Sequence, residues 1–193
     1  RREFLFETVL ASVSFPAVAL ANEKGNLLDA FRVYADETNK FEISIPQADW
    51  LVGRGEGDDA RRSVTAFYPP QSSKSNVSLV ITGLGADFTK LESFGKVDAF
   101  AETLIGGLDR SWQRPPGVAA RLIDSKAANG LYYIEYTLKN PGESRRNLLT
   151  VMGISKSTDG FYNRLYTLTG QFVEEEEQEF AEKIRKAVSS FRL

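Results

Sequence analysis

The residue types that could do chemistry are few, because the chain of 193 residues contains no histidine and no cysteine. It therefore cannot build a Ser-His-Asp triad or a Cys-His nucleophile pair. The usual zinc sites of cysteine and histidine are excluded too. An enzyme on this chain would have to use carboxylates, such as those of Asp58, Asp59 or Asp87. The separation of a catalytic carboxylate pair is spatial, so no spacing in the sequence identifies one.

One acidic segment has the ligand chemistry of calcium. Glu56, Asp58 and Asp59 lie within the stretch GEGDD at 55–59, and Ca²⁺ prefers carboxylate oxygens. The segment lacks the ligand spacing of an EF-hand loop, and an acidic surface loop is usually just solvated. We expect a solvated loop here and keep a calcium site as the alternative.

Two pairs of neighbouring arginines could bind an acidic surface. Arg61 and Arg62 precede the expected strand SVTAFYP, and Arg145 and Arg146 precede NLLTVMG. The guanidinium group is planar, keeps its charge and can pair with a carboxylate through two hydrogen bonds. These four residues are our candidates for docking on a partner, and the alternative is that they only keep the chain soluble. The net charge of −2 provides no basic footprint for nucleic acid.

The elements that must position these residues are mostly strands. Apolar and polar residues alternate at 41–45, 77–82, 131–139, 148–154 and 161–169. In the third of these, Tyr132, Ile134, Tyr136 and Leu138 share one face. Turn residues such as Asn129 and Gly130 separate the strands. Consecutive strands with short connections predict an antiparallel meander.

Two segments have the period of a helix instead. Apolar residues recur at spacings of three and four from Lys96 to about Trp112, and a second stripe runs through the last part of the chain. The glutamates at 174–177 stand at the start of the second helix, where carboxylates favour the helix dipole; a calcium or partner patch is the alternative. Farther along, Glu and Lys at 179/183 and 182/186 have the spacing of ion pairs. Helices on a meander predict an α+β fold, a central antiparallel sheet flanked by helices in layers.

Several longer stretches together resemble the PsbP-domain family over about residues 30 to 193. They are KFEISIPQADW at 40–50, NVSL at 76–79, GLYYIEYTL at 130–138 and FYNRLYTLTGQF at 161–172. The resemblance implies the PsbP-like layered fold. It also implies a non-catalytic accessory protein of the chloroplast thylakoid lumen, peripheral on the lumenal membrane face. Its partners would be subunits of a photosynthetic complex, photosystem II with its oxygen-evolving complex or photosystem I, whose assembly or stability it would support.

The resemblance has two limits. Gln171, Phe172 and Val173 run into the glutamates at 174–177, where many relatives have an Asn-Glu-Arg-Arg-Trp-like segment. Calcium is possible by resemblance, but family metal sites that use histidine cannot be transferred to this chain. A lumenal small-molecule-binding protein or a carboxylate enzyme on the same fold remains the alternative.

The first 21 residues have the composition of an address. Arg1 and Arg2 precede a mildly apolar run that ends in Ala19-Leu20-Ala21, a small-x-small cleavage pattern. The arginine pair resembles a twin-arginine signal. A membrane span is a poorer interpretation, because Glu7 and Pro16 interrupt the run. We therefore expect a cleaved lumenal targeting segment at 1–21, with a retained anchor as the alternative, followed by a single PsbP-like domain at 22–193.

Overall fold

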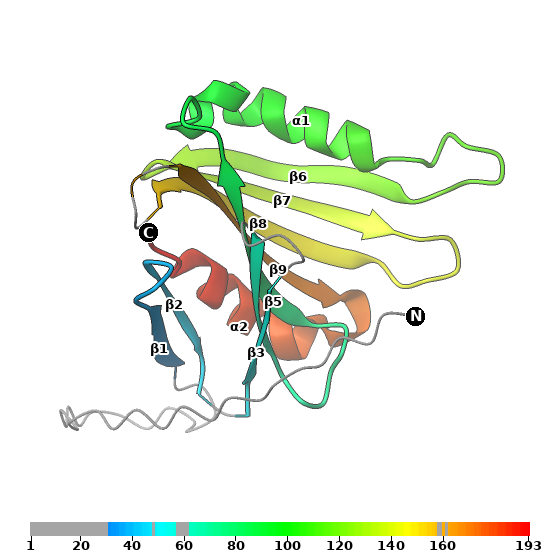
Figure 1. The fold of residues 1–193 in the computed structure, drawn as a ribbon. Helices are drawn as coiled ribbons and strands as arrows, with labels where there is room; N and C mark the ends of the chain where they lie inside the picture. Colours follow the sequence, from blue (N-terminus) through cyan, green and yellow to red (C-terminus); the bar gives the residue numbers. More distant parts are fainter. Residues whose placement is uncertain (1–30, 48, 57–61, 158–159, 161) are drawn as a thin grey trace.

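The computed structural model describes residues 31–47, 49–56, 62–157, 160 and 162–193 (Figure 1). Along these residues the chain forms strands first, then a helix, a four-strand meander and a second helix. In chain order the elements are β1 (Phe31–Asp36), β2 (Phe41–Pro46), β3 (Leu51–Glu56), β4 (Arg62–Tyr68), β5 (Asn76–Leu84), the 3₁₀ turn η2 (Leu91–Phe94), α1 (Val97–Leu108), β6 (Ala119–Ala128), β7 (Leu131–Lys139), β8 (Arg146–Lys156), β9 (Asn163–Val173), the 3₁₀ turn η3 (Glu174–Glu176) and α2 (Glu177–Ser189).

The main sheet has the strand order β3-β4-β5-β9-β8-β7-β6, and all its neighbours are antiparallel. The strands β6 to β9 follow one another as the predicted meander. A second set, β3 to β5, joins the meander where β5 pairs with β9, with Asn76 opposite Gln171. The hairpin β1–β2 forms a separate two-stranded sheet. The α+β fold class predicted from the sequence is confirmed.

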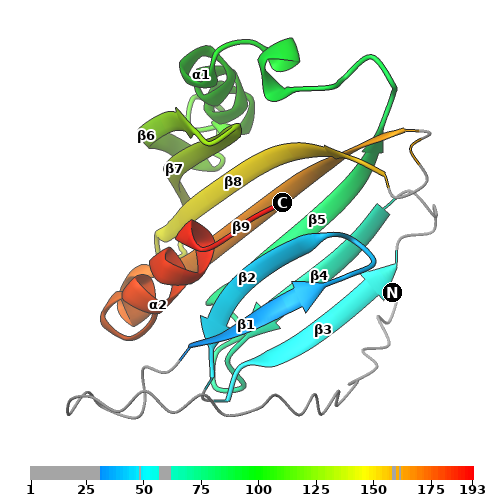
Figure 2. The ribbon, with the colours of Figure 1, turned by 90° about the vertical axis from the view of Figure 1, so that its left-hand side faces the viewer.

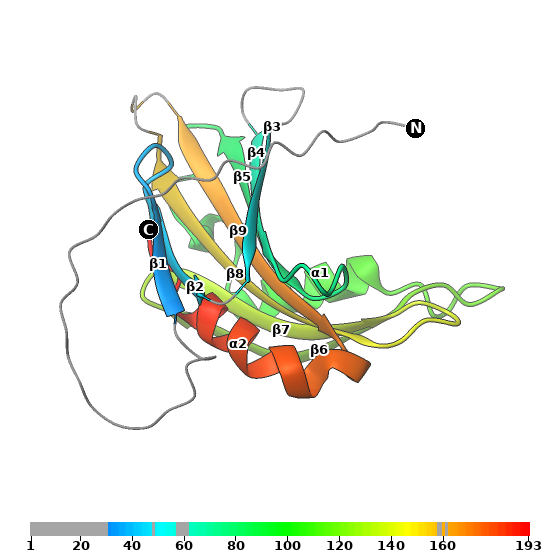
Figure 3. The ribbon, with the colours of Figure 1, turned by 90° about the horizontal axis from the view of Figure 1, so that it is seen from below.

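The helices lie on opposite faces of the main sheet. Figures 1 and 2 show α1 over β6 and β7 on one face, and α2 with the β1–β2 hairpin on the other. Figure 3, from below, shows α2 crossing under the meander. Strand β7 serves both layers: Tyr132 and Ile134 pack with α1, whereas Tyr133 packs at the margin of the opposite core. The alternation expected for this strand is therefore confirmed.

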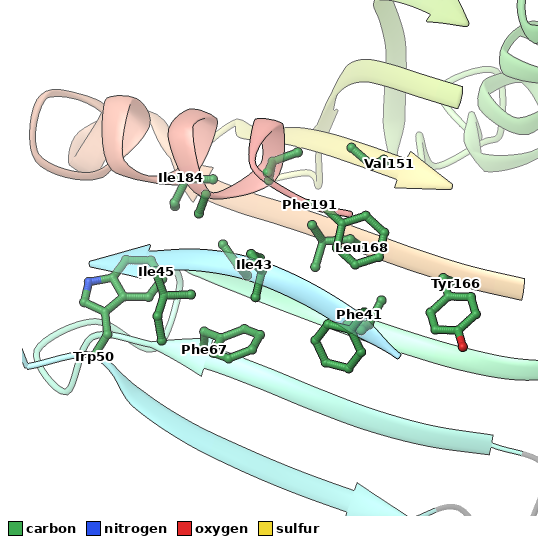
Figure 4. Packing of buried hydrophobic residues seen from close by; sticks show 14 of the residues in the cluster. Phe41, Ile43, Ile45, Trp50, Phe67, Val151, Tyr166, Leu168, Ile184 and Phe191 are labelled. Atoms are coloured by element: carbon green, nitrogen blue, oxygen red, sulfur yellow. The ribbon is translucent and has the colours of Figure 1, made fainter. Parts of the chain in front are cut away.

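The larger core lies between the sheet, α2 and the hairpin (Figure 4). Burying each large apolar side chain contributes about 1.5–3 kcal/mol relative to leaving it in water. The stripe predicted for the second helix is buried here, including Phe180 and Ile184. Close approach of α2 depends on Gly170, because a Cβ there would lie 2.5 Å from Cγ2 of Ile184. The N–H of Ser44 donates to Oγ of Ser190 at 2.8 Å, which joins β2 to the end of α2.

The predicted end of the first helix is wrong. Helix α1 ends at Leu108, before Trp112. The N–H of Asp109 still donates to the helical carbonyl of Ile105, at 2.9 Å, but the N–H of Arg110 donates to Val118 at 2.7 Å instead. The chain therefore turns away from the helix axis four residues before Trp112, because long-range backbone bonds replace the helical ones.

Two further details differ from the predictions. Strands β8 and β9 extend beyond the expected 148–154 and 161–169. Within the described residues, the expected ion pairs of α2 are not among those formed. Lys186 instead lies with its ammonium 4.0 Å from the centroid of the Phe31 ring, and Lys183 lies over Phe180. In the described part of the chain, neither helix has the length and apolar character needed to span a membrane.

Candidate docking surfaces

The antiparallel register gives the main sheet two distinct ends. We call one the hairpin end; it contains the β1–β2 turn, the end of β5 and the start of β9. We call the other the α1–β6 end; it contains the α1–β6 loop at 109–118, the β7–β8 turn at 140–145 and η3. Figure 1 shows the α1–β6 loop and the β7–β8 turn extending together beyond the helix layer.

The structure does not bring the two predicted arginine pairs together. Arg62 begins β4 at the hairpin end, where its row across the sheet passes through Thr82 and Leu165 to Ile154. Arg146 begins β8, eight residues before Ile154. At about 3.4 Å per residue, these rows are about 27 Å apart. The two pairs therefore cannot form one compact patch. Arg61 lies outside the described residues.

Arg145 and Arg146 already have carboxylate partners. Nη2 of Arg145 lies 2.7 Å from Oε1 of Glu174, and Nη2 of Arg146 lies 3.4 Å from Oε2 of Glu143. The N–H of Glu174 also donates to the carbonyl of Arg145 at 2.9 Å. These contacts hold the β7–β8 turn against η3. Docking through these arginines stays a prediction, and a partner would have to compete with both glutamates.

The glutamate segment at 174–177 joins elements that are distant in sequence. The carboxylate of Glu176 accepts hydrogen bonds from the hydroxyls of Ser72, at 2.6 Å, and Ser75. Glu175 accepts a hydrogen bond from the Ser144 hydroxyl, which lowers the pKa of this carboxyl below its ordinary value. The segment in which the chain departs from the pattern of its relatives thus attaches the start of α2 to the β4–β5 connection and the β7–β8 turn.

The predicted calcium ligands and catalytic carboxylates remain untested. Glu56 is the last residue of β3, while Asp58 and Asp59 lie outside the described residues. Asp87 is an exposed residue of the connection after β5. Among the residues that the structure describes, no group of three or more acidic side chains is arranged to hold a metal. Calcium binding and carboxylate chemistry therefore stay predictions.

A buried carboxylate organises the hairpin end. The side chain of Asp36 is only 5% exposed, and its Oδ1 accepts the backbone N–H groups of Thr38 and Asn39 at 3.0 and 2.8 Å. Nη2 of Arg54 lies 3.5 Å from Oδ2 of the same carboxylate. Arg54 also donates to the hydroxyl of Tyr34, which raises the pKa of this guanidinium. Asp36 therefore fixes the β1–β2 turn and connects it to β3.

Tyr166 and Arg164 bind the same turn from β9. The Tyr166 hydroxyl donates to the carbonyl of Asn39 at 2.7 Å, and Nη1 of Arg164 lies 3.3 Å from Oδ1 of that asparagine. Burial raises the pKa of Tyr166 above its ordinary value, partly offset by the adjacent Arg164. The sequence analysis missed this cluster. Aspartate two and three residues before Thr38 and Asn39 is an Asx-turn signal that predicts the local part, but not its partners on β3 and β9.

Two shallow hollows occur in the described structure. One, of about 210 Å³, lies between α2 and strands β6 to β8. Arg185 of α2 and Glu135 of β7 form a two-bond ion pair beside it, at 2.6 and 3.0 Å. The other, of about 480 Å³, lies at the α1–β6 end, where Lys74 and Arg146 face Glu143. The first is smaller than typical ligand pockets of about 300–1,000 Å³, and the second is lined mainly by polar residues rather than the usual apolar ones.

The comparisons with known proteins agree with this architecture. A model of the PsbP family matches residues 29–193. This chain belongs to the PsbP family. It is 59% identical over 195 residues to PsbP domain-containing protein 3, chloroplastic, of Arabidopsis thaliana, covering 100% of this chain and 77% of the relative. These two findings support a chloroplast location.

The fold has also been seen in a solved structure. The cyanobacterial PsbP protein CyanoP of Synechocystis sp. PCC 6803 superimposes with a TM-score of 0.61 at 17% identity. The match covers 90% of this chain and 98% of CyanoP. At this identity the likeness concerns the fold alone, because fold by itself does not define function. It supports the PsbP-like arrangement of a large antiparallel sheet with helices.

Proposed function

We propose that this PsbP-family protein is a non-catalytic accessory protein of the chloroplast thylakoid lumen. It docks on the lumenal side of a photosynthetic membrane complex, either photosystem II or photosystem I, and supports the assembly or stability of that complex. It is peripheral to the membrane and binds no nucleic acid. Family membership and the chloroplast relative support the proposal at the level of protein class, and the arrangement of polar side chains supports a binding role.

The observation that carries the binding role is the internal use of the hairpin-end cluster. Asp36, Arg54 and Tyr166 are the groups that a catalytic interpretation would choose first, because burial or altered pKa values often mark reactive sites. Each of them instead satisfies a neighbouring group of the same chain, at the distances given above. A cluster whose donors and acceptors bond one another stabilises the fold and leaves no free group for a substrate.

The N-terminal segment belongs to the same proposal. Residues 1–21 lie outside the described structure, and we propose that they direct the protein to the lumen and are then removed. N-terminal sequencing of protein recovered from its native membrane should begin near Asn22. Recovery of a form that still contains Arg1 and Arg2 would favour a retained anchor instead.

Native gel electrophoresis tests the proposed function. Thylakoid membranes are solubilised in mild detergent, separated on a native gel, and the band that contains this protein is identified by mass spectrometry. We expect the protein to migrate with a membrane complex and to be released when the membranes are first washed with high salt, since exposed charges act through screened electrostatics. Protease added to intact thylakoids should not digest it. Migration only as the free protein, or digestion from outside, would contradict the proposal.

A further inference from the structure

The two tryptophans of the chain have opposite environments. Trp50 is 5% exposed and belongs to the core beneath the hairpin, whereas Trp112 is 69% exposed. Trp112 is the most exposed large hydrophobic residue in the described part of the chain. An isolated exposed apolar side chain needs no explanation by itself. What distinguishes Trp112 is the structure of the loop that presents it.

The α1–β6 loop is held in one conformation by its own backbone. Arg110 donates its N–H to Val118 at 2.7 Å, and its carbonyl accepts the N–H groups of Gly117 and Gln113 at 2.9 and 3.1 Å. The Asp109 carboxylate accepts the N–H of Ala120 at 3.1 Å. These bonds close the loop at its base. Trp112 is thus presented without the entropy cost of ordering a flexible segment on binding.

The base of the loop is packed as well as hydrogen bonded. A Cβ added at Gly117 would lie 2.7 Å from Cβ of Arg110 and 3.0 Å from its carbonyl oxygen. The two sides of the loop therefore touch at a position that only glycine permits. This close approach offers a way to distort the loop without changing the residues at its tip.

Two arginines flank Trp112 without a carboxylate partner. Nη1 of Arg110 donates to the carbonyl of Asp109 at 2.7 Å, and Nη1 of Arg114 donates to the carbonyl of Gln113 at 3.1 Å. In the described part of the chain, neither guanidinium has a carboxylate oxygen within 4.0 Å. At the same end of the sheet, Arg145 and Arg146 do have such partners. The charge of the loop arginines is therefore available to another molecule.

From this arrangement we infer that Trp112, Arg110 and Arg114 form a docking element for an acidic protein surface. The inference rests on the proposed function and names the surface through which the protein docks. Tryptophan and arginine are the residue types most enriched among the residues that dominate protein interfaces. The guanidinium groups would pair with partner carboxylates, and the indole would enter an apolar depression between them.

A protein partner fits this loop better than a lipid surface does. Segments that lie in the membrane interface bury a continuous apolar face. Here Trp112 is flanked by Ser111 and Gln113, and it is the only exposed large hydrophobic residue between positions 109 and 118, all of which the structure describes. One indole between polar neighbours matches a specific pocket rather than a lipid layer.

Binding of the purified protein to thylakoid membranes stripped of peripheral proteins tests the inference. Trp112→Ala, and separately Arg110→Gln/Arg114→Gln, should weaken the apparent affinity about ten-fold or more, as expected for residues that dominate an interface. Val33→Ala and Arg62→Gln remove an exposed apolar group and an exposed arginine from other parts of the chain; they should bind like wild type. Gly117→Ala should weaken binding in the same way as Trp112→Ala, with the tip residues unchanged.

Fluorescence gives a second readout. Wild-type Trp112 should become shielded from acrylamide on binding, while the Trp112→Phe variant reports on buried Trp50 and should show no change. If wild type fails to bind, both the proposed function and this inference are wrong. If wild type binds and the loop variants bind equally well, only this inference is wrong. Equal binding to protein-free vesicles of thylakoid lipids, or a dimer in solution that Trp112→Ala abolishes, would identify a membrane or a second copy as the occupant and overturn it.

Discussion

The two ends of the main sheet use arginine and aromatic side chains in opposite ways. At the hairpin end, Arg54 and Arg164 contact tyrosine hydroxyls, and Arg54 also faces the buried carboxylate of Asp36. At the α1–β6 end, Arg110 and Arg114 donate only to nearby carbonyls, and Trp112 is exposed to solvent. The same residue types thus complete the fold at one end and remain available for binding at the other.

This difference shows that residue type alone does not identify a binding surface. An arginine whose donors are satisfied by its own chain has less to gain from a partner, because each new contact replaces an existing one. An arginine that bonds only to carbonyls can pair with an incoming carboxylate at little cost. Substitutions at the two ends should therefore separate stability from binding, and the expected effects on the free energy of unfolding decrease in the order given below.

The largest effect is expected for Asp36→Ala. The change removes the acceptor of two turn N–H groups and the carboxylate partner of Arg54. Leaving buried groups without partners is costly, so the free energy of unfolding should fall by about 2–3 kcal/mol in urea denaturation. Asp36→Asn keeps one acceptor oxygen and should cost less, and the exposed Asp87→Ala should stay within about 0.5 kcal/mol of wild type. A loss at Asp36 no larger than that of the control would contradict the structural role of the cluster.

A smaller effect is expected for Tyr166→Phe. Loss of the hydrogen bond to Asn39, at 2.7 Å, should lower the free energy of unfolding by about 1 kcal/mol. The effect should also depend on pH. Because burial raises the pKa of Tyr166 in the folded state, its protonated form stabilises the fold below about pH 10, and this stability is lost as the pH rises further. The difference between wild type and Tyr166→Phe should therefore shrink above about pH 10; a constant difference would show that Tyr166 does not titrate differently on folding.

Reversal of the paired arginines should have a still smaller effect. Arg145→Glu/Arg146→Glu breaks the ion pairs with Glu174 and Glu143, which are partly exposed. Such pairs contribute about 0–1 kcal/mol, so the thermal midpoint should decrease only slightly. For docking, we compare Arg145→Gln/Arg146→Gln with Arg110→Gln/Arg114→Gln and expect the second change to reduce membrane retention more. The reverse order would restore Arg145 and Arg146 as the main docking residues.

The smallest effect on stability is expected for Trp112→Ala. The side chain is 69% exposed, so the free energy of unfolding should change by less than about 0.5 kcal/mol. Trp50→Ala serves as the contrast, because it creates a cavity in the core and should cost about 3–5 kcal/mol. Comparable losses for the two tryptophans in urea denaturation would mean that the α1–β6 loop contributes to the fold rather than to binding.

The sequence predicted the features that depend on neighbouring residues. The alternation in β7 correctly assigned Tyr132 and Tyr133 to opposite faces, because successive side chains of any strand point to opposite sides. The stripe around Phe180 and Ile184 correctly gave the buried face of α2, because a helix repeats every 3.6 residues. Asn129 and Gly130, predicted as a turn, both have positive φ, at 53° and 75°. Resemblance over the longer stretches correctly gave the family.

The predictions failed where distant segments meet. Helix α1 was expected to reach Trp112, but the apolar period could not show that Arg110 would bond to Val118. Likewise, no local pattern distinguished Arg145, which pairs with Glu174, from Arg114, which has no such partner among the described residues. Each of these outcomes depends on contacts made only after the chain has folded.

By itself, the sequence determined the strand and helix periods, the turn positions, the absence of histidine and cysteine chemistry, and membership of the PsbP family. The tertiary structure alone decided that β5 lies beside β9, that Asp36 meets Arg54 of β3, and that one tryptophan is buried while the other is exposed. The physical reason is the range of the interactions. Periodicity reflects backbone geometry within a few residues, whereas burial and ion pairing depend on which distant segments pack together, and the sequence around each residue carries no record of that packing.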